Sequence, residues 1–199
     1  MVKVFPPPFR REVSRIVAAS DTKYKLGADY FCDGKDDQIE IQKAIDDVKQ
    51  TGGTVFLKQG TYFLSGPIVI DKSNVKIEGE GFSTVIKLIN GVNDYAIKIV
   101  GSAIEGCRVE NLYIDGNAAN QTAGGCILID GSAGYARRNW IINNFIDNGK
   151  EANIKLYRSA SNFITNNFIA GSQEDGIKLD NYSTTNKIID NEFYNNANY

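Results

Sequence analysis

The chain has 199 residues, of which 42% are hydrophobic and 23% are charged, with a formal net charge of −2. This composition is typical of one globular domain with a sizeable core, and it lacks the basic excess that binding to nucleic acids or anionic membranes requires. No stretch approaches the ~20 apolar residues of a membrane-spanning helix, and the absence of histidine excludes Ser-His nucleophile pairs and His-ligated zinc.

Residues 1–26 are predicted to form an N-terminal arm and a lead-in strand. The first residues (MVKVFPPPFRREV) lack the apolar run of about 7–15 residues that a signal peptide contains. Pro6, Pro7 and Pro8 favour an extended arm, which either anchors the module to a neighbour or forms a disordered leader.

Residues 27–53 are predicted to form a capping segment with one helix. Asp36 or Asp37 is suited to begin the helix, and Gly52–Gly53 to end it. Such a helix would cover the open end of a stack of strands. Its apolar residues follow helical spacing: Ile39, Ala44, Ile45 and Val48.

One asparagine-rich phrase occurs three times in the second half of the chain: NWIINNFID (139–147), NFITNNFIA (162–170) and NKIIDNEFY (186–194). The first asparagines of the copies are 23 and 24 residues apart, and CRVENLYID (107–115) fits the same template. A second phrase, with apolar residues two positions apart, lies between the copies: AIKIV (96–100), CILID (126–130), NIKLY (153–157) and GIKLD (176–180). This alternation predicts short β-strands.

A period of this length with short strands and Asn/Gly turns is typical of a solenoid. The leucine pattern of leucine-rich repeats is missing, so residues 54–199 are predicted to form an all-β, single-stranded, right-handed parallel β-helix. Equivalent residues of successive coils would then stack about 4.8 Å apart. The recurring asparagines are predicted to point inward and to bond to one another and to turn backbone groups. The three cysteines, which show no CxxC spacing, are expected to be buried free thiols: Cys32, Cys107 and Cys126.

Three segments carry a resemblance to a known family: ADYFCDGKDDQIEIQKAID (28–46), GGTVFLKQGTYFLSGPIVI (52–70) and VKIEGEGFSTVIKL (75–88). They resemble the N-terminal region of right-handed β-helix proteins of the pectate-lyase superfamily (the pectin-lyase-like fold), and the resemblance covers residues 27–199. Members include polysaccharide lyases, glycoside hydrolases and epimerases, as well as bacteriophage tailspikes. The resemblance therefore implies contact with a polysaccharide, in an extracellular or virion-associated setting. It is specific for fold and weak for activity.

Known catalytic signatures of that superfamily are absent, since the NTD, DD, GHG and RIK set of polygalacturonases and the YG-x-D-P-H motif of alginate epimerases do not occur. Asp115 and Asp147 are equivalent in consecutive copies, and their predicted offset of about 4.8 Å is close to the ~5–5.5 Å of retaining glycosidases. Asp130 and Asp180 are equivalent two coils apart, with Tyr157 between them, at about 9.6 Å. The alternative is that these aspartates only form turns. A weaker hypothesis is a calcium site, at Asp130, Glu174, Asp175 and Asp180. No other cofactor or metal is predicted.

Several aromatic residues of the asparagine-rich phrases are predicted to point away from the core. A register slip of one residue would move the repeated isoleucines outside, so it is rejected. Two explanations stay open: a platform on which sugar rings stack, or a protein interface of the kind that joins tailspike trimers. The candidate residues for substrate binding or for this interface are Trp140, Phe145, Phe163, Phe168, Tyr157 and Arg158.

The last copy of the phrase supplies one strand and no cap follows it, so the β-helix is expected either to be C-terminally incomplete or to be covered by another subunit, as in a homotrimer. The sequence thus favours a β-helix that recognises or cleaves an acidic or complex glycan, as a lyase or glycoside hydrolase. The alternative is a non-catalytic structural or adhesion module of a phage-like tailspike or surface appendage.

Overall fold

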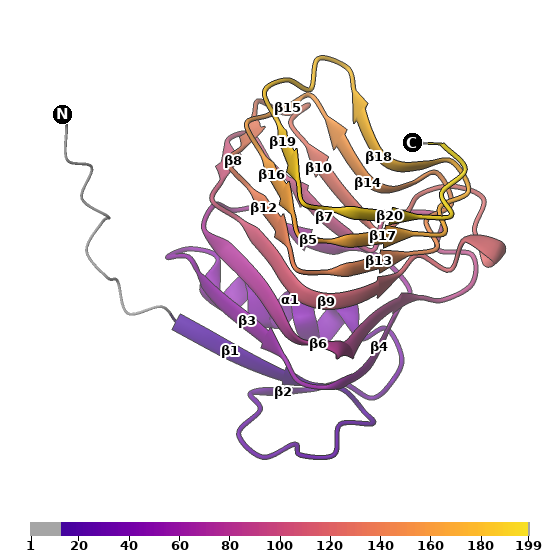
Figure 1. The fold of residues 1–199 in the computed structure, drawn as a ribbon. Helices are drawn as coiled ribbons and strands as arrows, with labels where there is room; N and C mark the ends of the chain where they lie inside the picture. Colours follow the sequence, from indigo (N-terminus) through magenta and orange to yellow (C-terminus); the bar gives the residue numbers. More distant parts are fainter. Residues whose placement is uncertain (1–12, 199) are drawn as a thin grey trace.

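The computed structural model describes residues 13–198, which form a right-handed parallel β-helix with one α-helix near its N-terminal end (Figure 1). Strands of successive coils pair in parallel, so each sheet runs along the length of the solenoid. The predicted fold class is confirmed. The proline-rich arm proposed for the first residues lies outside the described range.

The largest sheet has twelve strands and forms one broad face. Its main path, in spatial order, is β19 (Lys187–Ile189), β16 (Phe163–Thr165), β12 (Trp140–Ile142), β9 (Arg108–Asp115), β6 (Val75–Leu88), β3 (Gly53–Leu57), β1 (Val13–Ala18) and β2 (Tyr30–Phe31). Four more strands pair alongside this path: β20 (Glu192–Tyr194), β17 (Phe168–Ala170), β13 (Phe145–Asp147) and β4 (Gly60–Leu64).

Two smaller sheets close the solenoid. The five-stranded sheet contains β18 (Asp175–Asp180), β14 (Ala152–Tyr157), β10 (Ile127–Asp130), β7 (Ile97–Val100) and β5 (Ile68–Ile70). The three-stranded sheet contains β15 (Ser159–Ala160), β11 (Ala136–Arg137) and β8 (Ile104–Glu105). One short 3-10 helix, Ala118–Asn120, follows β9.

A single coil turns at residues with left-handed backbone conformation. Between β14 and β17 these are Arg158 (φ 48°) and Ser161 (φ 56°), followed by Asn166 (φ 55°). Asparagine tolerates this conformation better than most residues because its short side chain bonds locally. The first asparagine of each NN pair, Asn143 or Asn166, and the residue at the same place in the neighbouring coils, Asn111 or Asp190, are thus explained by the shape of the coil.

The predicted register of the repeats is confirmed. Ile141 pairs with Val109 on one side and with Ile164 on the other, and Ile164 pairs with Ile188. The alternating phrases align as expected too, at Ile97, Ile127, Ile154 and Ile177.

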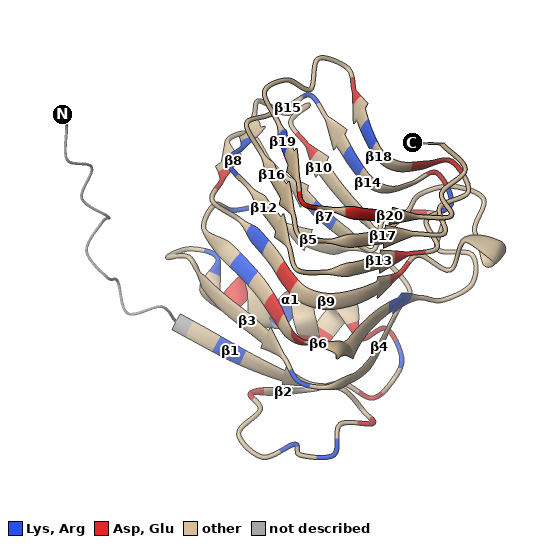
Figure 2. Ribbon diagram, viewed as in Figure 1, with Lys and Arg blue, Asp and Glu red and all other residues tan. Residues whose placement is uncertain are grey.

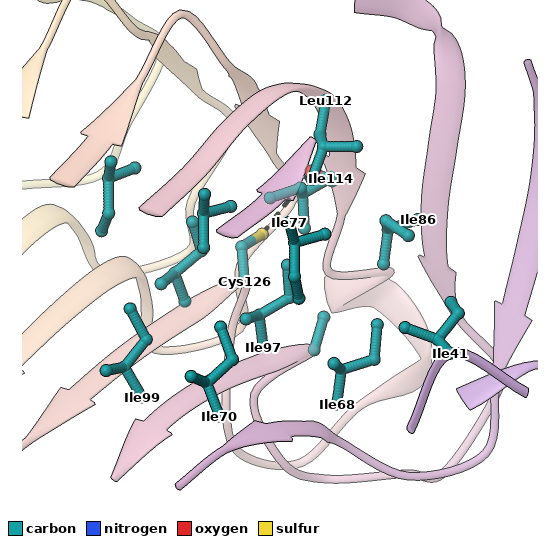
Figure 3. Packing of buried hydrophobic residues seen from close by; sticks show 14 of the residues in the cluster. Ile41, Ile68, Ile70, Ile77, Ile86, Ile97, Ile99, Leu112, Ile114 and Cys126 are labelled. Atoms are coloured by element: carbon teal, nitrogen blue, oxygen red, sulfur yellow. Dashed lines mark hydrogen bonds between the residues drawn. The ribbon is translucent and has the colours of Figure 1, made fainter. Parts of the chain in front are cut away.

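Inward side chains of all these strands form one continuous core (Figure 3), in which Ile70, Ile99 and Ile114 are fully buried. Two columns of asparagine run beside them. Asn139 and Asn162 are 0% exposed, and the Oδ1 of Asn162 accepts hydrogen bonds from the backbone N–H and the side-chain amide of Asn139, at 3.0 and 3.1 Å. The asparagine ladders are therefore structural, as predicted. The three free cysteines are buried as well.

Helix α1 (Gln38–Val48) packs against β1, β3 and β5 at the N-terminal end of the solenoid (Figure 1). Its buried face consists of Ile41, Ala44, Ile45 and Val48, whereas Ile39 is 47% exposed. The expectation that Ile39 belongs to this face is wrong. Asp37 occupies the position before the helix, but its carboxylate accepts bonds from the backbone N–H groups of Gly34 and Phe63. It therefore fastens the helix start to β4.

The last coil exposes apolar side chains on its inward columns: Leu179 (45%), Ile188 (38%) and Phe193 (39%). In earlier coils the equivalent residues are fully buried, because the next strand covers them. In the described part of the chain, no helix is both long and apolar enough to cross a membrane.

Candidate functional site

Asp115 and Asp147 lie opposite each other on β9 and β13, as the repeat predicts. Asp115 is 7% exposed and forms an ion pair with the Nζ of Lys87, at 2.7 Å. Its Oδ1 accepts bonds from the backbone N–H of Asn117 (2.8 Å) and the side-chain amide of Asn148 (3.3 Å). This carboxylate is therefore held in one place by three donors from three neighbouring segments.

Asp147 has a different environment. Burial raises its pKa above the ordinary value, and the adjacent Asp115 carboxylate adds to the increase, against a bond from the backbone N–H of Asn148 that lowers it. Burial also raises the pKa of Tyr113, two residues before Asp115, to about 12. Two neighbouring carboxyl groups thus differ: one is paired with a lysine, and the other is biased towards its protonated form.

A surface hollow of about 380 Å³ lies next to Asp115, although neither aspartate is among the residues that line it. Lys87 and Asn117, which both bond to Asp115, are among the residues that line it; the others are Phe63, Leu88, Ile89 and Asn90. Sequence reasoning missed Lys87 and Asn148. The alignment of 75–88 with the repeats would have placed Lys87 opposite Asp115, as the structure does, but this segment breaks the period.

The second pair of aspartates lies elsewhere, on the five-stranded sheet. Asp130 and Asp180 both pair with Tyr157, so the predicted order across three strands is confirmed. The Oδ1 of Asp130 accepts the backbone N–H of Ser132 at 2.7 Å, which is the contact of a turn-forming aspartate. Asp180 lies 3.7 Å from the Nζ of Lys155. Arg158 is exposed at the bend that follows Tyr157.

This surface is strongly charged, as the blue and red bands on β14 and β18 show (Figure 2). Glu174 and Asp175, two of the residues considered for calcium, lie 3.7 and 3.4 Å from the Nζ of Lys178. A calcium ion here would have to compete with that lysine. The calcium hypothesis stays a prediction.

Another group, Cys32, Asp37 and Glu40, brings ligand-type atoms within 4.8 Å of one another in the capping segment. Both oxygens of Asp37 already accept backbone hydrogen bonds, and burial raises the pKa of Asp37 and Cys32. A metal ligand would need these groups in their charged forms. The environment therefore favours a structural role.

The predicted aromatic residues point outward, in two columns, and all four are half-buried. Trp140 and Phe163 stack at 5.2 Å with an angle of 6° between their planes. Arg108 covers the other face of Trp140 at 5.0 Å, and the Nζ of Lys187 lies 5.4 Å from the Phe163 ring. The column is a four-layer sandwich, so it turns its ring edges outward.

Phe145 and Phe168 form the second column, stacked at 4.7 Å and 9°. Tyr113 contacts Phe145 edge-on at 4.9 Å, and Tyr194 lies 6.4 Å beyond Phe168. Since sugar rings stack on the faces of aromatic rings, neither column offers a free platform. The aromatic candidates and Asp115/Asp147 share the large sheet, whereas Tyr157 and Arg158 belong to the other face.

Among solved structures, similar folds include ORF18 of Geobacillus virus E2, with 18% identity, a TM-score of 0.57 and coverage of 80% of this chain and 39% of that one. The A-module of mannuronan C-5 epimerase AlgE4 from Azotobacter vinelandii has 22% sequence identity and a TM-score of 0.60. The match covers 80% of this chain and 48% of that one. A Parabacteroides merdae protein provisionally described as a glycosyl hydrolase has 14% sequence identity and a TM-score of 0.52. The match covers 80% of this chain and 87% of that one. The chain thus spans less than half the length of the first two.

These likenesses concern the fold. A comparison with curated proteins gives no match. The family model described as "Rhamnogalacturonase A/epimerase, pectate lyase-like" matches residues 27–198, which include the capping helix and every strand from β2 to β20. The chain therefore belongs to the rhamnogalacturonase A/epimerase, pectate lyase-like family, whose fold it shares.

Proposed function

We propose that this chain binds an acidic or complex glycan on the large sheet and cleaves it at Asp115 and Asp147. The observation that carries the proposal is the contrast between these neighbours: Asp115 is paired with Lys87, while the pKa of Asp147 is raised. Pairs of titratable groups with opposite environments are the usual basis of acid and base roles in glycoside hydrolysis. The family description, which names a rhamnogalacturonase and an epimerase, agrees with glycan chemistry.

In this mechanism, the protonated Asp147 donates its proton to the glycosidic oxygen as the bond to the leaving sugar breaks. The Asp115 carboxylate attacks the anomeric carbon and forms a glycosyl ester. Water then displaces Asp115, and Asp147 takes the proton from that water. Strands β9 and β13 are adjacent, so the carboxyl groups are offset by about 4.8 Å, which predicts retention of the anomeric configuration.

Lys87 has two roles in this proposal. Its ion pair holds the Asp115 carboxylate in position, and its partly exposed side chain (39%) lines the hollow next to Asp115. A positive charge at this place favours an acidic sugar over a neutral one.

The test is cleavage of a panel of polysaccharides, measured as new reducing ends, by the wild type and by Asp147→Asn, Asp115→Asn and Asp130→Asn. Asp130→Asn is the matched control, because Asp130 is a turn former on the other sheet. We expect loss of activity by a factor of about 10²–10⁴ in the first two variants only. The wild-type activity should fall as the pH rises through the raised pKa of Asp147, because the acid form is then lost.

Full activity in both Asp147→Asn and Asp115→Asn would refute the assignment. A product that absorbs in the ultraviolet because of a new C=C bond would instead indicate a lyase.

The second candidate is a structural or adhesion module. The outward columns of Trp140 and Phe145, whose ring edges form an apolar surface on the large sheet, favour it, because aromatic residues are enriched at protein interfaces. This candidate predicts a trimer in light scattering during size-exclusion chromatography, which Trp140→Ser should disrupt. A stable monomer would count against it.

A further inference from the structure

A second hollow, of about 260 Å³, lies on the outward side of the large sheet, where β12 bends into β13. It is lined by Gly81, Phe82, Leu112, Asn143, Asn144, Phe145, Asn166 and Phe168. None of these residues is ionisable. The volume lies below the ~300–1,000 Å³ of sites for drug-sized ligands, and so suits a single small ring.

The wall of this hollow comes from an irregularity in β6. The pairing of β6 with β9 shifts register between Glu78 and Gly81 and again between Gly81 and Val85. The extra residues bring Phe82 to the surface, where it is 70% exposed and touches Phe145 in a tilted contact at 5.1 Å. In contrast to the stacked columns, most of this ring is free.

Hydrogen bonds within the bulge hold Phe82 in place. The Oγ1 of the fully buried Thr84 accepts the backbone N–H of Glu80 at 2.9 Å and donates to the carbonyl of Leu57 at 3.3 Å. The hydroxyl of Ser83 donates to the carbonyl of Glu80 at 2.9 Å. The backbone that carries Phe82 is therefore preorganised, which lowers the entropic cost of binding.

Two side-chain amides lie at the bend of the same hollow. Asn143 (φ 57°) and Asn166 (φ 55°) are both exposed, and their side-chain amides form no hydrogen bond with any other described residue. The neighbouring Asn144, which also lines the hollow, uses its amide inside the ladder. The backbone conformation explains why asparagine is found at the bend, but the free amides add donors and acceptors to an otherwise apolar wall.

We infer that this hollow is a sugar subsite that binds one neutral pyranose ring of the glycan, with the ring on Phe82 and its hydroxyl groups on the amides of Asn143 and Asn166. Free aromatic faces and a few convergent polar groups are the chemistry that recognises such a ring. The uncharged lining disfavours a uronate, whose carboxylate would lose water without gaining an ionic partner. The inference takes from the proposed function only that the ligand is a glycan. It does not depend on whether the glycan is cleaved.

The test uses ¹⁵N-labelled protein and pairs of methyl glycosides that differ only at carbon 6: those of glucose, galactose and mannose, and those of the corresponding uronic acids. We expect at least one neutral glycoside to shift the side-chain amide resonances of Asn143 and Asn166, with affinity at least fivefold above that of its uronate partner. Equal affinities, or shifts confined to other surfaces, would overturn the inference.

Variants locate the binding. Phe82→Ala should weaken binding at least tenfold, and Phe31→Ala, which removes an exposed ring from β2, should leave it unchanged. Asn143→Gly keeps the bend and removes the amide, so it should weaken binding about threefold or more. Asn195→Gly, at another left-handed exposed asparagine, is its control. If Phe82→Ala binds as tightly as Phe31→Ala, the inference is wrong.

The two proposals can fail separately. Binding at Phe82 without any cleavage in the polysaccharide panel would contradict the proposed reaction and leave the subsite intact. Cleavage that depends on Asp147 but is indifferent to Phe82, with no neutral glycoside at the hollow, would contradict the subsite alone.

Discussion

The second asparagine ladder provides a quantitative test of what holds the coils together. Asn167 is 2% exposed. Its Oδ1 accepts two bonds from Asn144, from the backbone N–H at 3.0 Å and from the side chain at 3.1 Å. Its amide donates to Ile141, Thr165 and Asn191 at 2.9, 3.1 and 2.9 Å. Asn167→Ala removes all five bonds.

The loss of stability depends on which hydrogen-bonding groups have no partner after the substitution. The buried backbone N–H of Asn144 loses its acceptor, which costs about 2 kcal/mol, and each of the other four bonds contributes about 0.5 kcal/mol because its partner keeps some alternative. The sum is a loss of about 4 kcal/mol in the free energy of unfolding. This is a large fraction of the ~5–15 kcal/mol of a typical domain.

The assay is urea unfolding followed by far-ultraviolet circular dichroism. The matched control is Asn166→Gly, because the neighbouring Asn166 is exposed and its side chain bonds to no other described residue. Glycine accepts the left-handed conformation without strain, so the control should change stability by less than about 0.5 kcal/mol. If Asn167→Ala costs less than about 1 kcal/mol, the ladder does not hold the coils, and the reasoning fails.

Three other predictions use the same unfolding assay or a thiol reagent. Asp147→Asn should stabilise the protein relative to the wild type at pH 7 and lose this advantage below pH ~4. The reason is that a carboxyl group with a raised pKa stabilises the folded state at low pH, and this stability is lost as the pH rises through the raised pKa. An advantage independent of pH would contradict this. Ile41→Ala should cost about 2–5 kcal/mol and Ile39→Ala under 1, and equal losses would contradict the observed helix face. An aromatic disulfide reagent at pH 8 should modify no cysteine until urea is added, since burial raises the thiol pKa values, that of Cys107 to about 11.

The parts of the fold that repeat could be predicted from the sequence. A parallel solenoid places equivalent residues of each coil in one column, so aligning the phrases is the same operation as finding the register. Hence Asp147 falls opposite Asp115, and Trp140 opposite Phe163, as expected. The inward asparagines were predictable for the same reason, because only a structural role explains their recurrence at a buried bend.

What does not repeat could not be found by alignment. Helix α1 does not belong to the repeat, and its face follows from helical spacing alone: Ile41, Ala44, Ile45 and Val48 are at i, i+3, i+4 and i+7, which Ile39 does not fit. Phe82 reaches the surface because β6 contains extra residues relative to β9. The inward residues change from odd positions (Val75, Ile77) to even positions (Ile86, Leu88) across this bulge, but comparison with the regular coils does not show which side chain it exposes. Sequence analysis placed the aromatic columns outside, but whether a ring shows its face or its edge depends on rotamers and neighbours such as Arg108.

The same contrast explains where chemistry is found on this solenoid. A residue that recurs in every coil meets its own copy above and below, so its bonding capacity is used inside the stack: asparagine amides bond to asparagines, and aromatic faces to aromatic faces. Free capacity remains at exposed bends, as at Asn143 and Asn166, and where a column changes its residue type. The column that contains Asp147 runs through Lys87, Asp115, Asp147 and Ala170. Asp115 is therefore paired with a lysine, whereas Asp147 has an aspartate on one side and an alanine on the other. Phe82 is a second such place. A β-helix can therefore acquire a binding site through a few departures from its repeat, while the ladders keep the coils in register.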